Sequence, residues 1–175
     1  EVTPHHLFLC DDDITTAYNT NLKMNPPLRS AKDAEALRQG IVDGSINCVV
    51  TDHAPHAAHE KDCEWEIAFF GTIGLETSLP LMLTHMVEPG IMSWSRLVEV
   101  MAVSPREILR LPAVKIEEGS VADLTLIDPE AEVEVTEDYF ESKSKNSAFL
   151  GNKLKGAACD VFCGGKRTLA NGVVA

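Results

Sequence analysis

Ile46-Asn47-Cys48-Val49-Val50-Thr51 is the stretch of sequence that decides the fold. It is a compact run rich in β-branched residues and suits a strand buried on both faces. Val2 to Leu9 also reads as a short buried strand, and the sequence between the two runs predicts a helix. Ser30 can cap that helix, Asp33 stands in its first turn, and Gly44 can end it. Strand, loop, helix and strand in this order form a βαβ unit, which predicts parallel strands and an α/β fold.

Helical signals dominate the middle of the chain. An apolar stripe predicts a helix from Leu75 onward, although Pro80 should kink or reset it. Ser93 can cap a second helix. Ser104-Pro105-Arg106-Glu107 has the pattern of a capping box with proline at the first helical position, and it predicts a third, short helix. The residues expected to face inward are Leu75, Leu79, Met82 and Met86 in the first helix, and Trp94, Leu97, Val98 and Met101 in the second.

The character of the chain changes near Pro112, after which short alternating runs replace the helical pattern. Gly164-Gly165 and Asn171-Gly172 are dipeptides typical of hairpin turns. We therefore expect two domains, a barrel part over residues 1–111 and a small β domain over residues 112–175. The expected short strands of the second domain are Gly119 to Ile127, Val133 to Thr136, Asp160 to Cys163, Lys166 to Leu169 and Val173-Val174.

The composition narrows the classes of function. The 175 residues carry a formal net charge of −12, whereas a nucleic-acid-binding surface needs clustered Lys and Arg, so no nucleic-acid partner is expected. No apolar run approaches the roughly 20 residues of a membrane span. Five cysteines at irregular spacings argue against a disulfide framework and favour a reducing cytoplasm. Cys159 and Cys163, four apart on a predicted strand, are expected to be packed thiols rather than metal ligands.

Thr51-Asp52-His53-Ala54-Pro55-His56 follows the second predicted strand and carries the strongest chemical signal. In α/β barrels the carboxyl ends of the strands hold the active site. A carboxylate such as Asp52 can ligate a metal there and accept a proton from metal-bound water, and His56 is placed to contact the same reactant. The same residues also suit a capped turn, in which Asp52 binds local amides and Pro55 fixes the loop. The residues alone leave both interpretations open.

Other polar and glycine-bearing positions suit the same face. Asn25, in the loop after the first strand, can hydrogen-bond a planar amide or ureide, or it can be a turn residue before two prolines. Arg29 can bind a carboxylate in bidentate fashion or remain solvated. Phe70-Gly71 lets the backbone approach a ligand closely, or it serves as a hinge. His5 and His6, as neighbours on a strand, would point to opposite faces, so that one lines the pocket mouth or both are packed.

Several motifs in order resemble the type I dihydroorotases of the amidohydrolase superfamily. They are Glu1-Val2-Thr3-Pro4-His5-His6-Leu7, Met24-Asn25-Pro26-Pro27-Leu28-Arg29, Thr51 to His56, Phe70-Gly71-Thr72-Ile73-Gly74-Leu75-Glu76-Thr77, Glu118 to Leu124 and Ser142 to Ser147. The resemblance covers essentially the whole chain. It implies α/β architecture: the last two β/α units of a distorted, metal-dependent (β/α)8 or TIM barrel, followed by the small β domain.

The resemblance also implies a function. Dihydroorotases reversibly hydrolyse dihydroorotate to N-carbamoyl-aspartate in pyrimidine (UMP) biosynthesis, with zinc and two ions expected in the complete enzyme. Asp52 matches the family's catalytic carboxylate, which ligates zinc and shuttles the proton. Asn25, His56 and the backbone of Phe70 and Gly71 match substrate-binding positions. His53 belongs to the motif, and the resemblance assigns it no direct role.

The chain departs from the family pattern at its beginning. The family's His-x-His motif, its bridging carboxylate or modified lysine and its two further metal-ligating histidines would all precede Glu1. The chain therefore reads as a fragment, and we expect it alone to hold no catalytic metal and to have no activity. Two barrel strands leave unpaired edges and uncovered apolar faces, so we expect self-association or pairing with the missing N-terminal half.

Two alternatives remain open on the sequence. One is a sister enzyme of the superfamily, a hydantoinase or allantoinase; His56 and the Asn25 to Arg29 motif favour dihydroorotase, because they suit a substrate with a carboxylate beside its ring. The other is a catalytically dead homologue that serves as a structural partner, for example of aspartate transcarbamoylase. The intact Asp52 and His56 argue against decay in this part of the chain.

Overall fold

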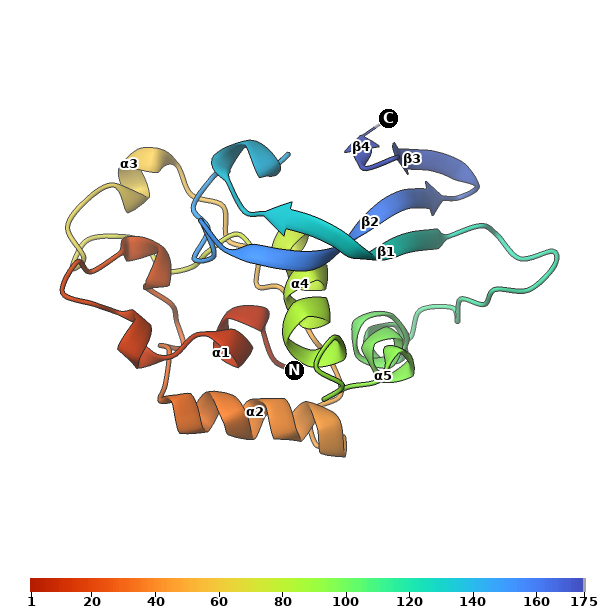
Figure 1. The fold of residues 1–175 in the computed structure, drawn as a ribbon, viewed down its shortest axis with the longest axis horizontal. Coiled ribbons are helices and arrows are strands. Elements are labelled where there is room, and N and C mark those ends of the chain that lie inside the picture. Colours follow the sequence, from red (N-terminus) through yellow and green to blue (C-terminus); the bar gives the residue numbers. More distant parts are fainter. Residues whose placement is uncertain (175) are drawn as a thin grey trace.

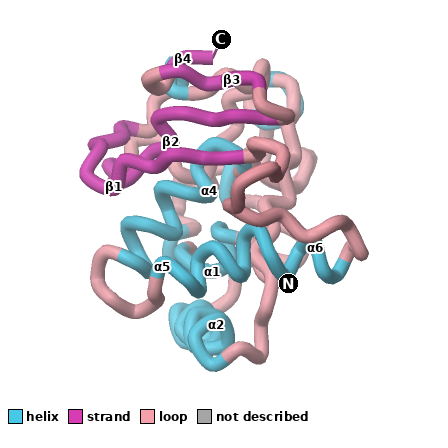
Figure 2. Tube along the Cα trace, turned by 90° about the vertical axis from the view of Figure 1, so that its right-hand side faces the viewer, coloured by secondary structure: helices cyan, strands magenta, loops and turns pink. Residues whose placement is uncertain are grey.

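The computed structural model describes residues 1–174, and it places a small antiparallel sheet over a layer of helices (Figures 1 and 2). The sheet has four strands in the order β1-β2-β3-β4. Helix α4 lies between the sheet and α2 in both views. None of the helices in residues 1–174 is long and apolar enough to cross a membrane. The helices are α1 (Pro4–Phe8), α2 (Ala31–Asp43), α3 (Ala58–Lys61), α4 (Leu75–Met82), α5 (Trp94–Val98) and α6 (Ser104–Ile108); the strands are β1 (Leu124–Glu134), β2 (Lys153–Cys163), β3 (Lys166–Ala170) and β4 (Val173–Val174).

The predicted parallel pairing exists, but only as isolated bridges. Val2 pairs with Val49 in parallel, and His53 pairs with Thr72 in the same sense. The prediction of a strand over Val2 to Leu9 was wrong, because α1 begins at Pro4. Thr3 caps this helix by accepting the His6 amide on its hydroxyl, and Pro4 supplies a φ already suited to a first helical turn. The extended run at Ile46–Thr51 likewise forms a single bridge rather than a full strand.

Helix α2 forms where its local signals predict it. Ser30 caps the helix and exchanges hydrogen bonds with Asp33 in a capping box, and Gly44 ends it with a left-handed φ of 87°. The Arg96 guanidinium then donates to the carbonyls of Ile41 and Ile46, both at 3.0 Å. These bonds satisfy carbonyl groups where α2 ends and tie it to α5.

Pro80 does not end α4. The helix continues through it into a π-helical turn, Leu83–Val87. Proline has no N–H for the carbonyl four residues earlier, which belongs to Glu76, and the Tyr139 hydroxyl donates to that carbonyl at 2.9 Å instead. Met82 and Met86 are buried as predicted, whereas Leu75 at the start of the stripe is exposed.

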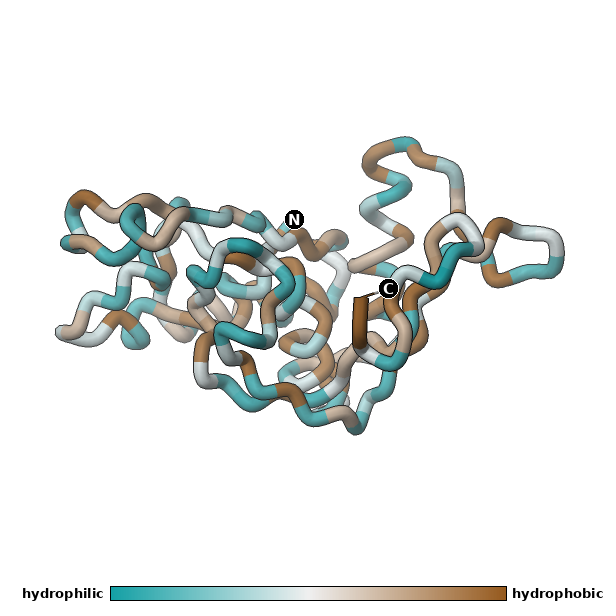
Figure 3. The backbone as a smooth tube through the Cα atoms, turned by 90° about the horizontal axis from the view of Figure 1, so that it is seen from above, coloured by the Kyte–Doolittle hydropathy of each residue, from teal (hydrophilic) through white to brown (hydrophobic). Residues whose placement is uncertain are grey.

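The helices after α4 depart from their predicted faces and caps. Ser93 caps α5 as predicted and Leu97 is buried, but Trp94 and Val98 are exposed. The expected capping box at Ser104 does not form, because a π-helical turn, Glu99–Val103, leads into α6 with helical backbone and leaves no free helix start to cap. Apolar and polar residues are interleaved along the whole trace, including its projecting segments (Figure 3). Exposed apolar residues after α5 include Val103, Ile108, Leu109, Leu111, Val114, Ile116 and Val121.

The small sheet follows the predicted turns. Gly164, Gly165, Asn171 and Gly172 all have positive φ, as tight hairpins of this kind require. The two strands predicted before residue 137 are one strand, β1, whose register with β2 shifts around Pro129 because proline cannot donate to the ladder. Cys159 is half-buried, but the prediction that Cys163 is packed was wrong, since its thiol lies in an exposed hairpin end.

Two apolar clusters form most of the core. One joins Val2 and Val49 to α2, α4 and α5. The other joins Ile73 and Leu81 to Val133, Val135 and Phe149 in the sheet region. Residues on both sides of position 111 therefore share a core, and the division into domains 1–111 and 112–175 remains a prediction.

Candidate active site

Asp52 stands directly after the bridged segment and has a left-handed backbone, with φ of 45°. Asp tolerates this conformation better than most residues, yet it is uncommon outside glycine and tends to occur at functional sites. The exposed side chain lines a cavity of about 730 Å³. The other residues of this cavity are Glu1, Val2, Thr3, His6, Pro26, Pro27, Arg29, Leu37 and Val50.

A second wall of this cavity is the loop Met24–Arg29, named here the 24–29 loop. His6 Nε2 lies 2.9 Å from the Pro26 carbonyl oxygen and donates to it, while His6 Nδ1 lies 2.6 Å from the Thr3 hydroxyl. Asn25 is exposed at the start of this loop and precedes a cis peptide bond. Arg29 reaches the cavity, so the structure brings Asp52 and Arg29 to one space.

The two neighbouring histidines of α1 have different surroundings. Because they lie on a helix, the prediction that they point to opposite faces of a strand does not apply. His6 lines the cavity, whereas His5 is 2% exposed and packs its ring against that of His6 at 4.5 Å. Burial and the neighbouring His6 lower the pKa of His5 from 6.5 to about 3.

His53 positions the start of α4. Its Nδ1 accepts the backbone N–H groups of Gly74 at 3.1 Å and Leu75 at 3.4 Å, so that the imidazole satisfies donors that the helix itself leaves free. A Cβ at Gly74 would stand 2.8 Å from the Thr51 carbonyl oxygen. The Thr51–His56 motif and the start of α4 therefore fit only because residue 74 is glycine.

His56 is held by three internal contacts. Its Nε2 donates to the Phe70 carbonyl at 2.9 Å, its Nδ1 lies 3.5 Å from the Glu60 carboxylate, and its backbone N–H bonds Ser144 and Asn146. It lines a second cavity of about 430 Å³ with Lys61 and Asn146. The structure thus places Asp52 and His56 at different cavities, although the sequence predicts that they contact one reactant.

Gly71 takes a backbone conformation that other residues rarely adopt. Its φ is 110°, and a Cβ there would stand 2.6 Å from that of Ala54. Its N–H donates to the Lys23 carbonyl at 2.8 Å. Within residues 1–174 the Phe70 N–H makes no hydrogen bond, which leaves it as the free donor of this dipeptide.

Sequence reasoning missed three side chains that shape this region: Lys23, Lys61 and Asn146. The Asn146 amide donates to the Ala54 carbonyl at 3.0 Å, and its Oδ1 accepts the His56 N–H at 3.1 Å. Lys23 donates to the Trp65 backbone carbonyl and Lys61 to that of Gly71, in the loop that ends at Gly71. The resemblance to the family's closing segment at Ser142 to Ser147 was the available signal for Asn146, whereas a lysine in a polar stretch gives no sign of burial.

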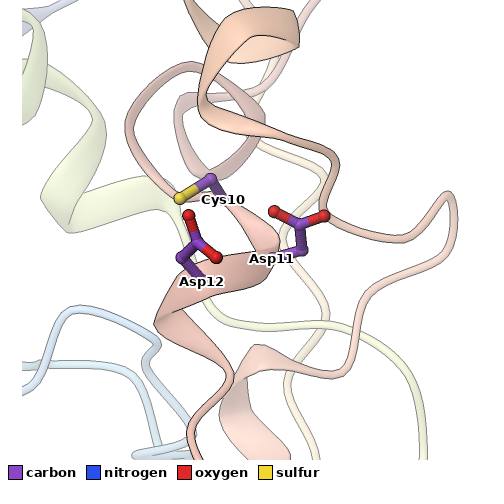
Figure 4. Close-up of side chains that lie close together, drawn as sticks. All are labelled: Cys10, Asp11 and Asp12. Atoms are coloured by element: carbon purple, nitrogen blue, oxygen red, sulfur yellow. The ribbon is translucent and has the colours of Figure 1, made fainter.

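Within residues 1–174, one group of three metal-ligating side chains lies close together: Cys10, Asp11 and Asp12 (Figure 4). Asp52 does not belong to such a group in this part of the chain. Both carboxylates of that group are exposed, and the Cys10 backbone N–H bonds Asp13. Exposed acidic groups like these, in the short 3-10 helix Asp11–Asp13, are common without an ion, so this group adds nothing to the site. Asp52 fits a metal as one oxygen ligand, and the described residues around it do not form a complete set.

Comparison with known proteins gives the same reading of the fold. No protein-family model matches the chain. Among solved structures, the L-hydantoinase (dihydropyrimidinase) from Arthrobacter aurescens matches 99% of this chain and 39% of its own, with a TM-score of 0.91 and 33% identity. The dihydropyrimidinase from Brevibacillus agri NCHU1002 has a TM-score of 0.89 at 18% identity, which speaks for the fold alone. The likeness confirms the predicted fold class, α/β units of a hydrolase barrel followed by a small β domain.

Sequence comparison is more specific. Dihydroorotase from Trichlorobacter lovleyi is 49% identical over 166 residues, which are 95% of this chain and 39% of that protein. Dihydroorotase from Bacillus subtilis is 45% identical over 172 residues, or 98% of this chain and 40% of that protein. The chain spans about two-fifths of the length of these curated relatives.

By its fold and by these matches, the chain resembles a segment of the cyclic amidohydrolases. Within that class, the chain is similar in sequence to a segment of the curated dihydroorotases.

Proposed function

We propose that the protein carrying this chain is a dihydroorotase, which interconverts dihydroorotate and N-carbamoyl-aspartate in pyrimidine biosynthesis. The observation that carries this proposal is the position of Asp52, whose carboxylate lines a cavity of about 730 Å³ together with Arg29. A carboxylate beside a cationic fork suits a substrate that has an acid group next to a cyclic amide. The curated relatives give the family, and the site chemistry supports this reaction within it.

We further propose that Asp52 is both a metal ligand and the proton acceptor. The families matched here are metal-dependent amidohydrolases, and zinc is the proposed ion. Such an ion supplies a Lewis acid and an activated water at neutral pH. The exposed Asp52 carboxylate can hold and release a proton at the cavity wall, and further ligands have to come from beyond the described set around it.

Substrate binding is assigned to residues around this cavity and to the loop beside it. Asn25 can pair its amide with the ureide, Arg29 can bind the carboxylate, and the free Phe70 N–H can bind a substrate oxygen. Gly71 gives that backbone its conformation. For His56 to bind substrate, its Nε2 has to exchange the Phe70 carbonyl for a substrate oxygen.

The test is Asp52→Asn in the protein expressed from its complete gene, assayed for dihydroorotate turnover. Loss of the acceptor carboxylate should lower kcat by about 10³-fold, within the range of general-base catalysis. Asp138→Asn is the matched control, because that carboxylate is exposed and distant in sequence from the motif. An Asp52→Asn protein that keeps the wild-type rate contradicts the proposal.

A hydantoinase or allantoinase is the second candidate, favoured by the 33% identity to the Arthrobacter aurescens L-hydantoinase. Arg29 at the cavity argues for the substrate with a carboxylate. The same preparation should therefore turn over dihydroorotate with the highest kcat/KM when it is compared with hydantoin and allantoin. Preference for either neutral ring would assign the chain to the sister activity.

We also propose that the surface after α5 is an association surface in the cytoplasm. Its apolar residues, among them Ile108, Leu109 and Ile116, are exposed in the isolated chain. We propose that a second copy or the remaining barrel covers this surface. The alternative is that the protein itself is an inactive homologue that binds aspartate transcarbamoylase. Light scattering of the chain alone should show association, and co-purification with aspartate transcarbamoylase tests the alternative.

A further inference from the structure

The loop Asp62–Gly71, named here the 62–71 loop, follows α3 and leads to the Phe70-Gly71 backbone (Figure 1). It has little regular secondary structure, so its carbonyl groups need partners from elsewhere. Two lysine side chains supply them. Lys23 Nζ donates to the carbonyls of Trp65, Glu66 and Ala68 at 2.7, 3.1 and 2.8 Å, and Lys61 Nζ donates to those of Phe69 and Gly71 at 2.8 and 3.0 Å.

Both lysines are buried without a counterion. Lys23 is 9% exposed and Lys61 is 6% exposed. Within residues 1–174 neither ammonium forms an ion pair with a carboxylate. A buried charge costs free energy unless polar groups solvate it, and here the loop carbonyls take the place of water. Burial and the charge of Lys23 lower the pKa of Lys61 from 10.5 to about 8.

In this arrangement the polar backbone of the loop faces the protein interior. Because the carbonyls face the two ammonium groups, apolar side chains are directed to the surface: Ile67, Phe69 and Phe70 are 67%, 54% and 53% exposed. Lys23 Nζ also lies 4.6 Å from the centre of the Phe70 ring, a cation–π contact. The two ammonium groups thus bind five carbonyls of this loop, while three of its large apolar side chains remain exposed.

The same two residues hold the dipeptide on both sides. The Lys23 backbone carbonyl accepts the Gly71 N–H, and Lys61 Nζ donates to the Gly71 carbonyl. His56 fixes the intervening Phe70 carbonyl. With these groups engaged, the Phe70 N–H is the donor left to face a ligand.

We propose that Lys23 and Lys61 are positioning residues that solvate the 62–71 loop from within and thereby hold the Phe70-Gly71 backbone in its substrate-binding conformation. The inference rests on the proposed function for the identity of the substrate. It concerns binding rather than the chemical step, because neither ammonium lines the cavity of Asp52.

The experiment uses Lys61→Met and Lys23→Met in the protein expressed from its complete gene, with Lys32→Met as the control at an exposed lysine of α2. The first readout is steady-state kinetics with dihydroorotate. Loss of an interaction made equally by bound substrate and transition state raises KM and leaves kcat unchanged, so KM should rise at least about tenfold while kcat changes less than about threefold. The control should keep both constants.

The second readout is hydrogen exchange of the Gly71 amide, which reports the loop independently of turnover. Either Met variant should exchange this amide at least about tenfold faster than wild type, and Lys61→Arg, which keeps a charged donor, should restore part of the protection. Should Lys61→Met fail to fold, Lys61→Gln replaces it, because its neutral amide keeps a donor for one carbonyl.

The outcomes separate the two claims. A folded Met variant with wild-type KM and a protected Gly71 amide overturns the inference. An equal fall of kcat and kcat/KM also overturns it, because it would indicate a role in the chemical step. If the wild-type protein does not turn over dihydroorotate, the proposed function fails and takes the substrate assignment with it. Gly71 exchange still decides in that case whether the lysines hold the loop.

Discussion

The 24–29 loop and the 62–71 loop both lie beside the Thr51–His56 motif, yet they are held by different chemistry. An imidazole holds the first, through the bond from His6 to the Pro26 carbonyl. Two buried ammonium groups hold the second, through five carbonyls. The α1 helix behind the first loop also buries His5 as a neutral imidazole. Acid and alkali should therefore act on the two regions in opposite directions.

The largest effect is expected from acid acting on His5. The pKa of His5 is about 3 in the folded chain, against 6.5 when the side chain is exposed. Between pH 3 and pH 6.5 the unfolded chain therefore binds one more proton than the folded chain. The unfolding free energy therefore decreases as pH falls from 6.5 toward 3, by up to about 1.4 kcal/mol per pH unit, or about 4 kcal/mol in all. Urea titrations at several pH values measure this, and His5→Phe should remove that part of the slope. An unchanged slope in His5→Phe would show that His5 is not buried as a neutral group.

Gly71→Ala should be the next largest perturbation, and it acts on the 62–71 loop. The new Cβ would stand 2.6 Å from that of Ala54 and the residue would keep a φ of 110°, so we expect a loss of about 3 kcal/mol in unfolding free energy. Gly90→Ala is the matched control: its φ of 75° is also positive, but no atom lies within 4 Å, and a loss of about 1 kcal/mol is expected. Equal losses in the two variants would mean that the contact with Ala54 is relieved at little cost.

Alkali should act on the 62–71 loop with the opposite sign. The pKa of Lys61 is about 8 in the folded chain and 10.5 when exposed, so the unfolded chain again binds the extra proton between these values. The unfolding free energy should increase as pH rises from 8 to 10.5, by about 2 kcal/mol, and Lys61→Met should not show this increase. Lys32→Met, at an exposed lysine, should keep it. A flat profile in the wild-type chain would contradict the buried, uncompensated ammonium.

The sequence predicted the features that depend on nearby residues and missed those that depend on distant ones. Helix α2 and the turns at Gly164-Gly165 and Asn171-Gly172 depend on signals within a few residues, and these predictions are confirmed. The helix at Pro4–Phe8 was mistaken for a strand because a short apolar run has no clear period, although Thr3-Pro4 is a helix-start signal. The bonds of Lys23 join it to carbonyls more than 40 residues away, and no local pattern encodes them.

The site residues divide in the same way. The position of Asp52 after a buried segment followed from the order of elements, because the carboxyl end of a parallel segment is set by topology. The separation of His56 from Asp52 could not be foreseen, since it depends on Ser144 and Asn146, which approach from the far end of the chain. The roles of Asp52, Asn25, His56, Phe70 and Gly71 remain predictions.

The smallest effect is expected at the imidazole bond of the 24–29 loop. His6→Leu removes the exposed hydrogen bond to the Pro26 carbonyl and the bond between Nδ1 and the Thr3 hydroxyl, so the unfolding free energy should fall by about 1 kcal/mol. His6→Gln, whose amide can still donate to that carbonyl, should lose less than half as much. Both losses are measured by urea denaturation at pH 8, where protonation of His5 does not affect the unfolding free energy. If His6→Leu lowered the unfolding free energy as much as Gly71→Ala does, the 24–29 loop would not be the less strongly held of the two loops. A single imidazole would then stabilise the protein as much as the close packing around Gly71.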